Sequence, residues 1–251
     1  MNILNKLVVA TIPAVPKSLV RHFASRYIAG ETIADAIRCV RQLNTEGCCA
    51  TLDVLGEDIS TKEEAVASRN QSIEVLQSIT REKLDSNLSI KLTSLGLKLD
   101  KRCCTENVRE ILKVAATHNI FVRFDMEDST CTTDTIDVFR ELHRDFPNTG
   151  IVLQAYLFRT EDDTKLLVKE KTNFRLCKGI YKESPSIAFQ GRREIQQNYL
   201  KQLRLMFENK SYVGVATHDT VLVDGAIRII NEMGLKKNEY EFQMLLGVRP
   251  E

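Results

Sequence analysis

The chain has 251 residues, of which 43% are hydrophobic and 27% are charged, and its formal net charge is +1. This length and composition predict a single globular domain with a substantial core, and the near-neutral charge gives no electrostatic reason to expect nucleic acid as a partner. The 7 cysteines include two adjacent pairs but no CxxC spacing, which argues against a disulfide framework or a zinc site.

An apolar strand, a polar turn and an amphipathic helix form a unit that recurs along most of the chain. Two helices, over residues 17–29 and 31–44, are predicted before the first strand. The strands are predicted over residues 48–55, 87–93, 120–126, 150–157, 173–179, 212–217 and 239–245. The helices between them are predicted over residues 60–83, 105–118, 130–145, 161–171, 192–208 and 220–233. Such alternation indicates parallel strands joined by right-handed crossovers.

Local sequence signals predict where some of these helices begin. The run Ser60-Thr61-Lys62-Glu63 has the order of a capping box, in which a hydroxyl and a carboxylate satisfy the first free N–H groups of a helix. We predict the same role for Thr105 and Glu106. Glu127 and Asp128 are interpreted as a solvated turn and a helix cap rather than as acid–base groups.

The polar residues of the strands occupy alternate positions, so they share one face of the predicted sheet. This pattern distinguishes a closed barrel from an open sheet. In an open sheet helices cover both faces, whereas a barrel buries only its outer face under helices. The polar parity comprises Thr51, Asp53, Ser89, Lys91, Arg123, Asp125, Gln154, Tyr156, Arg175 and Thr217. We therefore predict an α/β fold of the (βα)8 TIM-barrel type that lacks the eighth strand and the last helix. Residues 1–47 are expected to form a helical segment that precedes barrel residues 48–251 in one domain.

Strand 173–179 carries an arginine in its middle. Apolar residues alternate there with Arg175 and Cys177, so these two share one side of the strand. Burying an unpaired charge costs on the order of several kcal/mol, so Arg175 must be paired or must bind something. A purely structural arginine, paired with a core carboxylate, remains open at this point. Gly179 frees the backbone at the strand end, and Cys177 is interpreted as a small core residue rather than a thiolate nucleophile.

Together the predicted strand ends place Lys91, Arg175 and Lys178 opposite Asp125, with Gln154 beside them. This cationic mouth suits an electron-rich planar cofactor or a carboxylate substrate rather than a hydrolytic reaction. No metal is expected, because no histidine pair stands with a carboxylate at ligand spacing. The sequence also lacks a nucleophile elbow and a glycine-rich phosphate loop.

Six segments at the predicted strand ends form a recognisable series. They are Ser89-Ile90-Lys91-Leu92-Thr93, Arg123-Phe124-Asp125-Met126-Glu127-Asp128, Gln154-Ala155-Tyr156, Arg175-Leu176-Cys177-Lys178-Gly179-Ile180-Tyr181, Ala216-Thr217-His218 and Tyr240-Glu241-Phe242-Gln243-Met244-Leu245-Leu246-Gly247. In this order they resemble the strand motifs of the proline dehydrogenase family, in its monofunctional bacterial form. Residues 8–13 and 23–30 extend the resemblance over nearly the whole chain.

The resemblance implies a barrel that oxidises L-proline to Δ1-pyrroline-5-carboxylate with FAD as the hydride acceptor. We expect FAD to be bound noncovalently, because no His or Cys is placed with the specificity that a covalent link would need. The catalytic residues that it implies are Lys91, Asp125, Arg175 and Tyr181, and the substrate-binding residues are Lys91, Tyr181 and Leu245. The implied cofactor-binding residues are Asp125, Gln154, Arg175, Lys178, Gly179, Ala216, Thr217 and His218. Donors near the flavin N1, O2 and N5 would stabilise negative charge on the reduced ring.

The resemblance further implies a cytoplasmic enzyme that passes electrons to a quinone or another acceptor, with at most a peripheral contact at the inner face of the membrane. Structural roles stay open for some of these residues. Lys91 and Asp125 are alternatively an ion pair that fixes the barrel, and His218 a helix-start residue. Tyr156 and Tyr181 are alternatively packing residues of the mouth.

The family pattern continues past Glu251 with an eighth strand and with a helix whose two adjacent arginines clamp the substrate carboxylate. We expect the sequence to be a fragment of a longer reading frame, with natural truncation as the second interpretation. Residues 1–251 alone are expected to be poorly soluble and feebly active. Two alternatives from other classes are a Schiff-base aldolase or lyase that uses Lys91 or Lys178 as its nucleophile, and an inactive barrel remnant without flavin.

Overall fold

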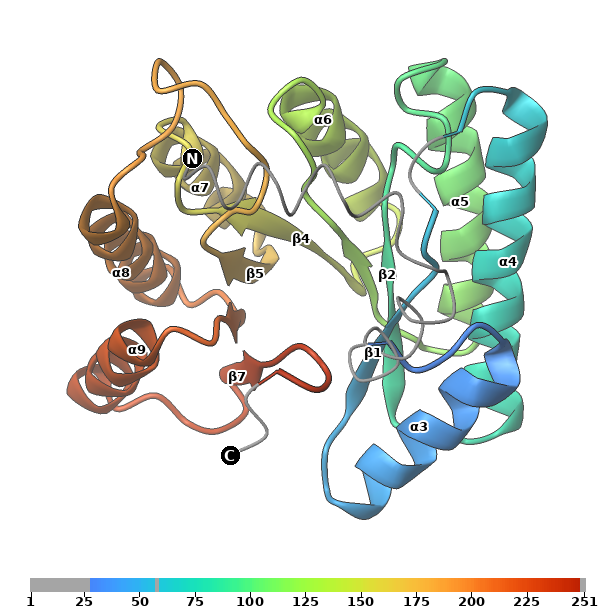
Figure 1. The fold of residues 1–251 in the computed structure, drawn as a ribbon, viewed down its shortest axis with the longest axis horizontal. Helices are drawn as coiled ribbons and strands as arrows, with labels where there is room; N and C mark the ends of the chain where they lie inside the picture. Colours follow the sequence, from blue (N-terminus) through green and yellow to red (C-terminus); the bar gives the residue numbers. More distant parts are fainter. Residues whose placement is uncertain (1–27, 57–58, 249–251) are drawn as a thin grey trace, which may run out of the picture.

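The computed structural model describes residues 28–56 and 59–248. One sheet, whose strands follow the order β1-β2-β3-β4-β5-β6-β7, forms its centre, and every pairing between neighbours is parallel. The strands are β1 (Ala50–Asp53), β2 (Ser86–Ile90), β3 (Val122–Phe124), β4 (Thr149–Gln154), β5 (Asn173–Cys177), β6 (Val213–Ala216) and β7 (Tyr240–Gln243). The sheet is curled, with helices around its outer side (Figure 1). The predicted TIM-barrel-type α/β class is therefore confirmed.

The helices alternate with the strands as predicted. They are α3 (Ile33–Thr45), α4 (Lys62–Arg81), α5 (Lys101–Thr117), α6 (Thr132–His143), α7 (Thr160–Leu167) with the 3-10 turn η2 (Val168–Glu170), α8 (Arg192–Glu208) and α9 (Thr220–Met233). The bounds of α8 and α9 agree with the prediction at both ends. Of the predicted helix 17–29, residues 17–27 lie outside the described residues. None of the helices described is both long enough and apolar enough to cross a membrane.

Every strand is shorter than the sequence predicted, because the apolar pattern continues beyond the hydrogen-bonded ladder. Leu92, Met126 and Leu157 follow the last residues of β2, β3 and β4, and all three are buried. Leu92 and Met126 belong to the main hydrophobic core, and Leu157 belongs to a smaller cluster with Tyr156 and Ala188. Apolar periodicity therefore predicted burial correctly but placed the strand ends too late.

Helix α4 begins with a capping box, but one residue later than predicted. The hydroxyl of Thr61 accepts a hydrogen bond from the N–H of Glu64 at 3.2 Å, and the carboxylate of Glu64 accepts one from the N–H of Thr61 at 3.0 Å. Ser60 also donates its N–H to Glu64. The pair Ser60 and Glu63 was therefore the wrong choice between two overlapping candidates.

Helix α5 begins earlier than predicted. Asp100 is its N-cap and accepts a hydrogen bond from the N–H of Cys103 at 3.1 Å. Thr105 and Glu106 consequently lie inside the helix, where the hydroxyl of Thr105 donates to the carbonyl oxygen of Lys101. Their predicted capping role is wrong, because Asp100 supplies the cap before the apolar periodicity becomes visible.

The strand residues that face the helices form the main core. Leu88, Phe124, Ile151, Phe174 and Val213 have no exposed surface. The opposite parity faces the inside of the curled sheet, where Arg175 of β5 lies in register with Val152 of β4 and with Gly214 of β6. This arrangement confirms that the polar residues of successive strands converge inside the sheet.

Thr217 is an exception to the predicted parity. Strand β6 ends at Ala216, and its inward positions are Gly214 and Ala216, which lie in register with Glu241 and Gln243 of β7. Thr217 lies past the strand, and its hydroxyl accepts a hydrogen bond from the N–H of Asp219 at 3.1 Å. Its predicted place among the inward-facing residues is therefore wrong.

Candidate active site

Charged side chains meet inside the curled sheet toward the C-terminal ends of its strands. Lys91, one residue past β2, contacts Asp53 at the end of β1, and its Nζ lies 3.7 Å from Oδ2 of Asp125. Asp125 follows β3 and accepts hydrogen bonds from Ser89 Oγ at 2.8 Å and from Arg175 Nη1 at 2.9 Å. The Asp125 carboxylate therefore lies between two cations, and the predicted pairing of Lys91 with Asp125 is present.

Arg175 has further partners on two other strands. Its Nη1 also donates to Ser89 Oγ at 3.1 Å, and its Nε donates to Gln243 Oε1 at 2.5 Å. The side chains of Arg175 and Asp125 are 16% and 17% exposed. Arg175 is thus paired with a carboxylate, as the structural alternative required, yet it remains reachable from the mouth.

A second buried cation lies at the N-terminal side of this network. Arg123 is 2% exposed, donates to the carbonyl oxygen of Asn173 at 3.1 Å and lies over the ring of Phe121. Gly150 makes this possible, because a Cβ there would come within 2.5 Å of the guanidinium. Burial lowers the pKa of Arg123 to about 9, so the group still carries its charge at neutral pH.

Asp219 forms a second charged cluster at the start of α9. Its carboxylate accepts hydrogen bonds from Lys178 at 3.2 Å, from Arg192 at 3.3 Å and from Gln196 at 3.0 Å. Burial alone would raise the pKa of Asp219, but hydrogen bonds from Gln196, Arg192 and Lys178 lower it to about 2. Asp219 therefore anchors Lys178, whose own side chain stays partly exposed.

His218 has a different role from the predicted helix start. The N-cap of α9 is Asp219, which accepts a hydrogen bond from the N–H of Val221. His218 Nε2 instead accepts a hydrogen bond from the N–H of Leu245 at 2.9 Å. The segment after β6 is thereby joined to the segment after β7, and two residues that were predicted for cofactor and substrate are brought together.

Gln154 is buried at the end of β4. Its Nε2 donates to the carbonyl oxygen of Glu127 at 2.7 Å, which occupies one of the two amide hydrogens. Glu127 itself is buried, and its carboxylate accepts hydrogen bonds from the N–H and the hydroxyl of Thr93. The prediction of a solvated turn at Glu127 is therefore wrong, since the residue ties the β2 and β3 ends together.

Asp128 shapes a turn rather than capping a helix. Its carboxylate accepts a hydrogen bond from the N–H of Thr130 at 2.9 Å and pairs with Lys98 at 2.6 Å. The N-cap position of α6 is Cys131, which makes no side-chain cap hydrogen bond. The predicted helix cap is thus wrong, although the residue does stabilise the loop that leads to α6.

The loop after β5 carries Gly179 and Tyr181. Gly179 has a φ of +108°, and a Cβ there would lie 2.1 Å from the ring of Tyr156. Further along the loop, Glu183 accepts hydrogen bonds from the N–H and the hydroxyl of Ser129 at 2.7 and 2.6 Å. The half-buried Tyr181 is therefore held between a tight backbone contact and an anchor on the loop before α6.

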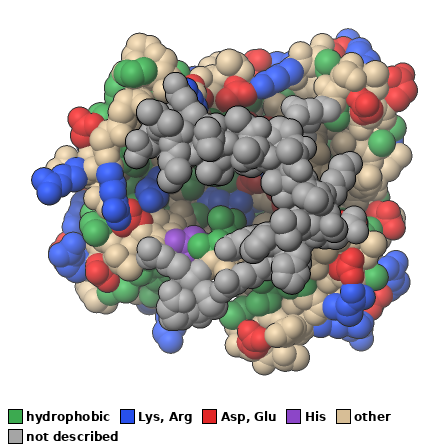
Figure 2. All heavy atoms as spheres, in the orientation of Figure 1, with side chains coloured by type: hydrophobic (Ala, Val, Ile, Leu, Met, Phe, Trp, Pro, Cys, Tyr) green, Lys and Arg blue, Asp and Glu red, His purple; other side chains and the backbone are tan. Residues whose placement is uncertain are grey.

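Apolar side chains stand around the polar network at the strand ends. Ile180 and Leu245 are 88% and 71% exposed, and Leu55 after β1 is similarly exposed. Strand β5 ends at Cys177, so the alternation of its side chains no longer sets the direction of Ile180. Figure 2 shows basic, hydrophobic and histidine side chains near the centre of this face.

These contacts argue against Lys91, Lys178 or Cys177 as a nucleophile. A Schiff-base nucleophile must be a neutral amine, whereas Lys91 and Lys178 are both paired with carboxylates. The thiol of Cys177 lies 3.6 Å from the carbonyl oxygen of Leu153, and burial raises its pKa to about 11. Cys177 is therefore a protonated core residue at neutral pH, as predicted. Over residues 28–56 and 59–248, no group of three or more potential ligands is placed to hold a metal ion.

Sequence reasoning gave no role to Asp53, Asp219 or Gln243. Its strand parity could have indicated that Asp53 faces the charged network. The position of Asp219 ahead of an apolar helical run could have indicated a helix cap. Gln243 gave no signal of its own, because its role depends on which side chains lie two strands away.

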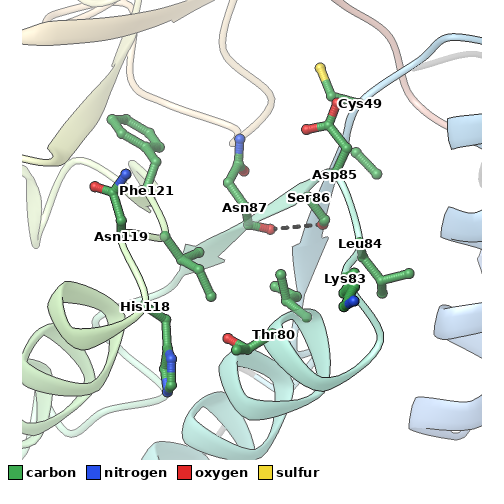
Figure 3. Close-up of a pocket in the computed structure, with 13 residues that line it drawn as sticks. Cys49, Thr80, Lys83, Leu84, Asp85, Ser86, Asn87, His118, Asn119 and Phe121 are labelled. Carbon is green, nitrogen blue, oxygen red and sulfur yellow. Dashed lines mark hydrogen bonds between the residues drawn. The ribbon is translucent and has the colours of Figure 1, made fainter.

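A pocket of about 410 Å³ lies at the other end of the sheet (Figure 3). Its lining comes from the N-terminal ends of β1 and β2 and from the segments that follow α4 and α5, including Cys49, Lys83, Asp85, His118 and Asn119. None of the residues predicted for catalysis or cofactor binding lines it. The candidate active site is therefore the C-terminal mouth and not this pocket.

Comparison with known proteins points to one family. A family model described as Proline dehydrogenase matches residues 36–249. Proline dehydrogenase 1 of Bacillus subtilis subsp. natto is 38% identical over 228 residues, which are 91% of this chain and 76% of that protein. Proline dehydrogenase 2 of Bacillus subtilis strain 168 is 37% identical over 92% of this chain and 78% of its own length. Proline dehydrogenase of Deinococcus radiodurans is 33% identical over 91% of this chain and 75% of its own length.

Solved structures share the fold. Proline utilization A (PutA) from Bdellovibrio bacteriovorus superposes with a TM-score of 0.85 at 24% identity, over 92% of this chain and 29% of that one. PutA from Corynebacterium freiburgense gives 0.80 at 23% identity, over 92% and 27% of the two chains. This chain thus corresponds to less than a third of each PutA chain.

Proposed function

The chain belongs to the proline dehydrogenase family, whose reaction is the oxidation of proline, and we propose that FAD accepts the hydride at the C-terminal mouth of the barrel. The observation that carries this proposal is the network Asp53–Lys91–Asp125–Arg175–Gln243. It places fixed charges of both signs at the end of a barrel where such folds keep their chemistry.

The proposed reaction converts L-proline into Δ1-pyrroline-5-carboxylate. The C–H bond that breaks is on the ring CH2 carbon next to nitrogen, and its two electrons leave with the hydrogen as hydride. The ring nitrogen releases a proton, and a C=N double bond forms. When bound, FAD supplies the acceptor for the hydride and a proton. The protein contributes orientation and electrostatic stabilisation.

The donor set of the mouth fits a flavin. A flavin presents a flat apolar ring with acceptor atoms along one edge, and it becomes more negative on reduction. The mouth offers Arg175 and Lys178 as cations and Gln154 as an amide donor. Exposed apolar side chains, Ile180 and Leu245 among them, stand beside these groups and suit the ring faces.

The roles of individual residues follow from these contacts. Arg175 would stabilise negative charge on the reduced ring, with Asp125 and Ser89 holding its guanidinium in place. Gln154 and Lys178 would bind beside the pyrimidine portion, and Asp219 would orient Lys178. Gly179 lets the backbone pass close to Tyr156 at this point.

Substrate contacts are proposed for Lys91, Tyr181 and Leu245. Lys91 contacts Asp53 and lies near Asp125, so its charge is held at the mouth and not in solvent. Leu245 is exposed beside His218, which accepts the hydrogen bond of its N–H. Ala216, Thr217 and His218 would contact the dinucleotide part of FAD next to the start of α9.

For reoxidation we propose a quinone or another electron acceptor, reached at the inner face of the membrane through a peripheral contact. FAD would be held without a covalent bond, since over residues 28–56 and 59–248 no His or Cys at the mouth is placed with the specificity that a covalent link requires.

The experiment that tests the proposed function follows the product. Protein loaded with FAD is mixed with L-proline and an artificial electron acceptor, and the medium is analysed by mass spectrometry. We expect a product two hydrogens lighter than proline, together with reduction of the acceptor in equal amount. Absence of that product from folded, FAD-loaded protein would contradict the proposal.

A further inference from the structure

The side-chain amide of Gln243 lies between the charged side chains of Arg175 and Glu241. Its Oε1 accepts the hydrogen bond of Arg175 Nε at 2.5 Å, and its Nε2 donates to Glu241 Oε1 at 2.5 Å. We propose that Gln243 is a positioning residue that fixes the plane of the Arg175 guanidinium for hydride transfer. This inference rests on the proposed function, because it concerns the cation that faces the accepting ring.

Glu241 determines which way round the amide lies. An ionised carboxylate only accepts hydrogen bonds, so the NH2 group of the amide must face Glu241. The carbonyl oxygen is then left to face Arg175, which can only donate. The orientation of Gln243 is therefore imposed by its two neighbours, and an inverted amide would place like groups in contact on both sides.

Gly214 provides the space for this contact. Gln243 belongs to β7 and Arg175 to β5, so the amide must reach across β6, which lies between them. Gly214 lies in register with both Arg175 and Glu241. A Cβ at this position would approach Nε2 of Gln243 to 2.7 Å and its Cδ to 2.9 Å. The absence of a side chain at residue 214 therefore opens the path between the two strands.

The contact completes the support of Arg175. Its Nη1 is held by Asp125 and Ser89, while its Nε is held by Gln243. A guanidinium is planar, so contacts on two different nitrogens fix its plane, whereas contacts on Nη1 alone leave rotation about that end. Because the electrostatic effect of a donor depends on its direction, loss of the Gln243 contact would weaken the action of Arg175 without removing its charge.

The test compares Gln243→Met with the wild-type protein and with Arg175→Met, all loaded with FAD. Methionine has a similar length but cannot accept the Nε hydrogen bond strongly. We expect Gln243→Met to slow anaerobic flavin reduction by L-proline about tenfold, since a hydrogen bond to a charged group is lost. We also expect a more negative flavin midpoint potential. In the Arg175→Met background, the same substitution should change neither quantity further.

Gln202→Met is the matched control. Gln202 is a fully buried glutamine of α8 that donates to Asn198 at 3.0 Å, so its replacement also removes a buried amide. We expect the midpoint potential of this variant to equal that of the wild-type protein. If Gln243→Met does not fold, Gln243→Asn replaces it, because an amide one methylene shorter cannot span β6.

Four outcomes separate the interpretations. The proposal is supported if Gln243→Met lowers both the rate and the midpoint potential of the wild-type protein but changes neither in the Arg175→Met background. A folded Gln243 variant with unchanged rate and potential would overturn it, and so would an effect that adds in full to that of Arg175→Met. Failure of the wild-type flavin to be reduced by proline would instead contradict the proposed function.

Discussion

Arg175 and Asp125 are 50 residues apart in the sequence, yet Nη1 of the arginine lies 2.9 Å from Oδ1 of the aspartate. The carboxylate of Asp125 also accepts a hydrogen bond from the hydroxyl of Ser89 and lies near Lys91. Asp125 therefore lies between two cations of the mouth, Lys91 and Arg175. We expect the loss of Arg175 to slow the reaction and the loss of Asp125 to lower the stability of the fold.

Replacement of Arg175 by methionine should leave the fold intact and slow flavin reduction by proline. A cation that stabilises developing negative charge contributes about 3 kcal/mol to the transition state, or on the order of a hundredfold in rate. Anaerobic stopped-flow absorbance measures this rate. Arg140→Met is the control, because Arg140 in the last turn of α6 pairs with Glu170 of η2, at the opposite end of the sheet from the mouth. Flavin reduction at the wild-type rate would leave Arg175 a purely structural role.

Replacement of Asp125 by asparagine should mainly lower stability. It leaves Lys91 and Arg175 close together without the charge between them, and breaking a largely buried pair of this kind costs roughly 2–3 kcal/mol. Urea unfolding measures the loss. Asp137→Asn removes an exposed partner of Lys101 and should cost less than about 1 kcal/mol. Equal losses in the two variants would show that the Asp125 network does not stabilise the barrel.

The cluster around Asp219 should make stability depend on pH at the acid end. The pKa of Asp219 is lowered in the folded protein from its usual 3.8 to about 2, so the carboxylate stabilises the fold above the higher value. That contribution, about 2 kcal/mol, is lost as pH falls from roughly 4 toward 2. Asp219→Asn should therefore be less stable than the wild-type protein at neutral pH, with the difference vanishing near pH 2.

Thermal unfolding of both proteins across this pH range measures the effect. Asp224→Asn is the control, because Asp224 is an exposed residue of the same helix. A difference between Asp219→Asn and wild type that stayed constant down to pH 2 would refute the assignment.

Gly179→Ala should disturb the mouth more than a glycine substitution elsewhere. Gly179 has a φ of +108°, and an added Cβ would meet the ring of Tyr156 at 2.1 Å. Gly234 has a φ of +63° but nothing within 4 Å of the added atom, so Gly234→Ala should cost only about 1 kcal/mol. We expect Gly179→Ala to lose more stability and to bind FAD more weakly. Calorimetry and fluorescence titration measure the two effects, and equal behaviour of both variants would count against the contact with Tyr156.

Much of the fold was predictable because its signals are local. The bounds of α8 and α9 agree with the prediction, and strand parity correctly placed Asp53, Ser89, Asp125 and Arg175 inside the sheet. These predictions depend only on the two periodicities of side-chain direction. The capping residues were less certain, since two overlapping candidates for a cap differ only in how the chain enters the helix.

The details of the site depended on contacts between distant residues. Glu127 was interpreted as solvated, yet the residue is buried and its carboxylate accepts a hydrogen bond from the N–H of Thr93, which follows another strand. Gln243 has no local feature that separates it from an ordinary strand glutamine, and only the register across Gly214 brings it to Arg175. Such relationships belong to the tertiary structure and not to any one segment.

The absorbance spectrum of the purified protein with added FAD, before and after anaerobic addition of L-proline, tests the central claim most directly. If the mouth binds FAD and oxidises proline, the visible flavin band appears with the protein and bleaches when proline is added. A protein that retains no flavin, or whose bound flavin stays oxidised with excess L-proline, would contradict the account.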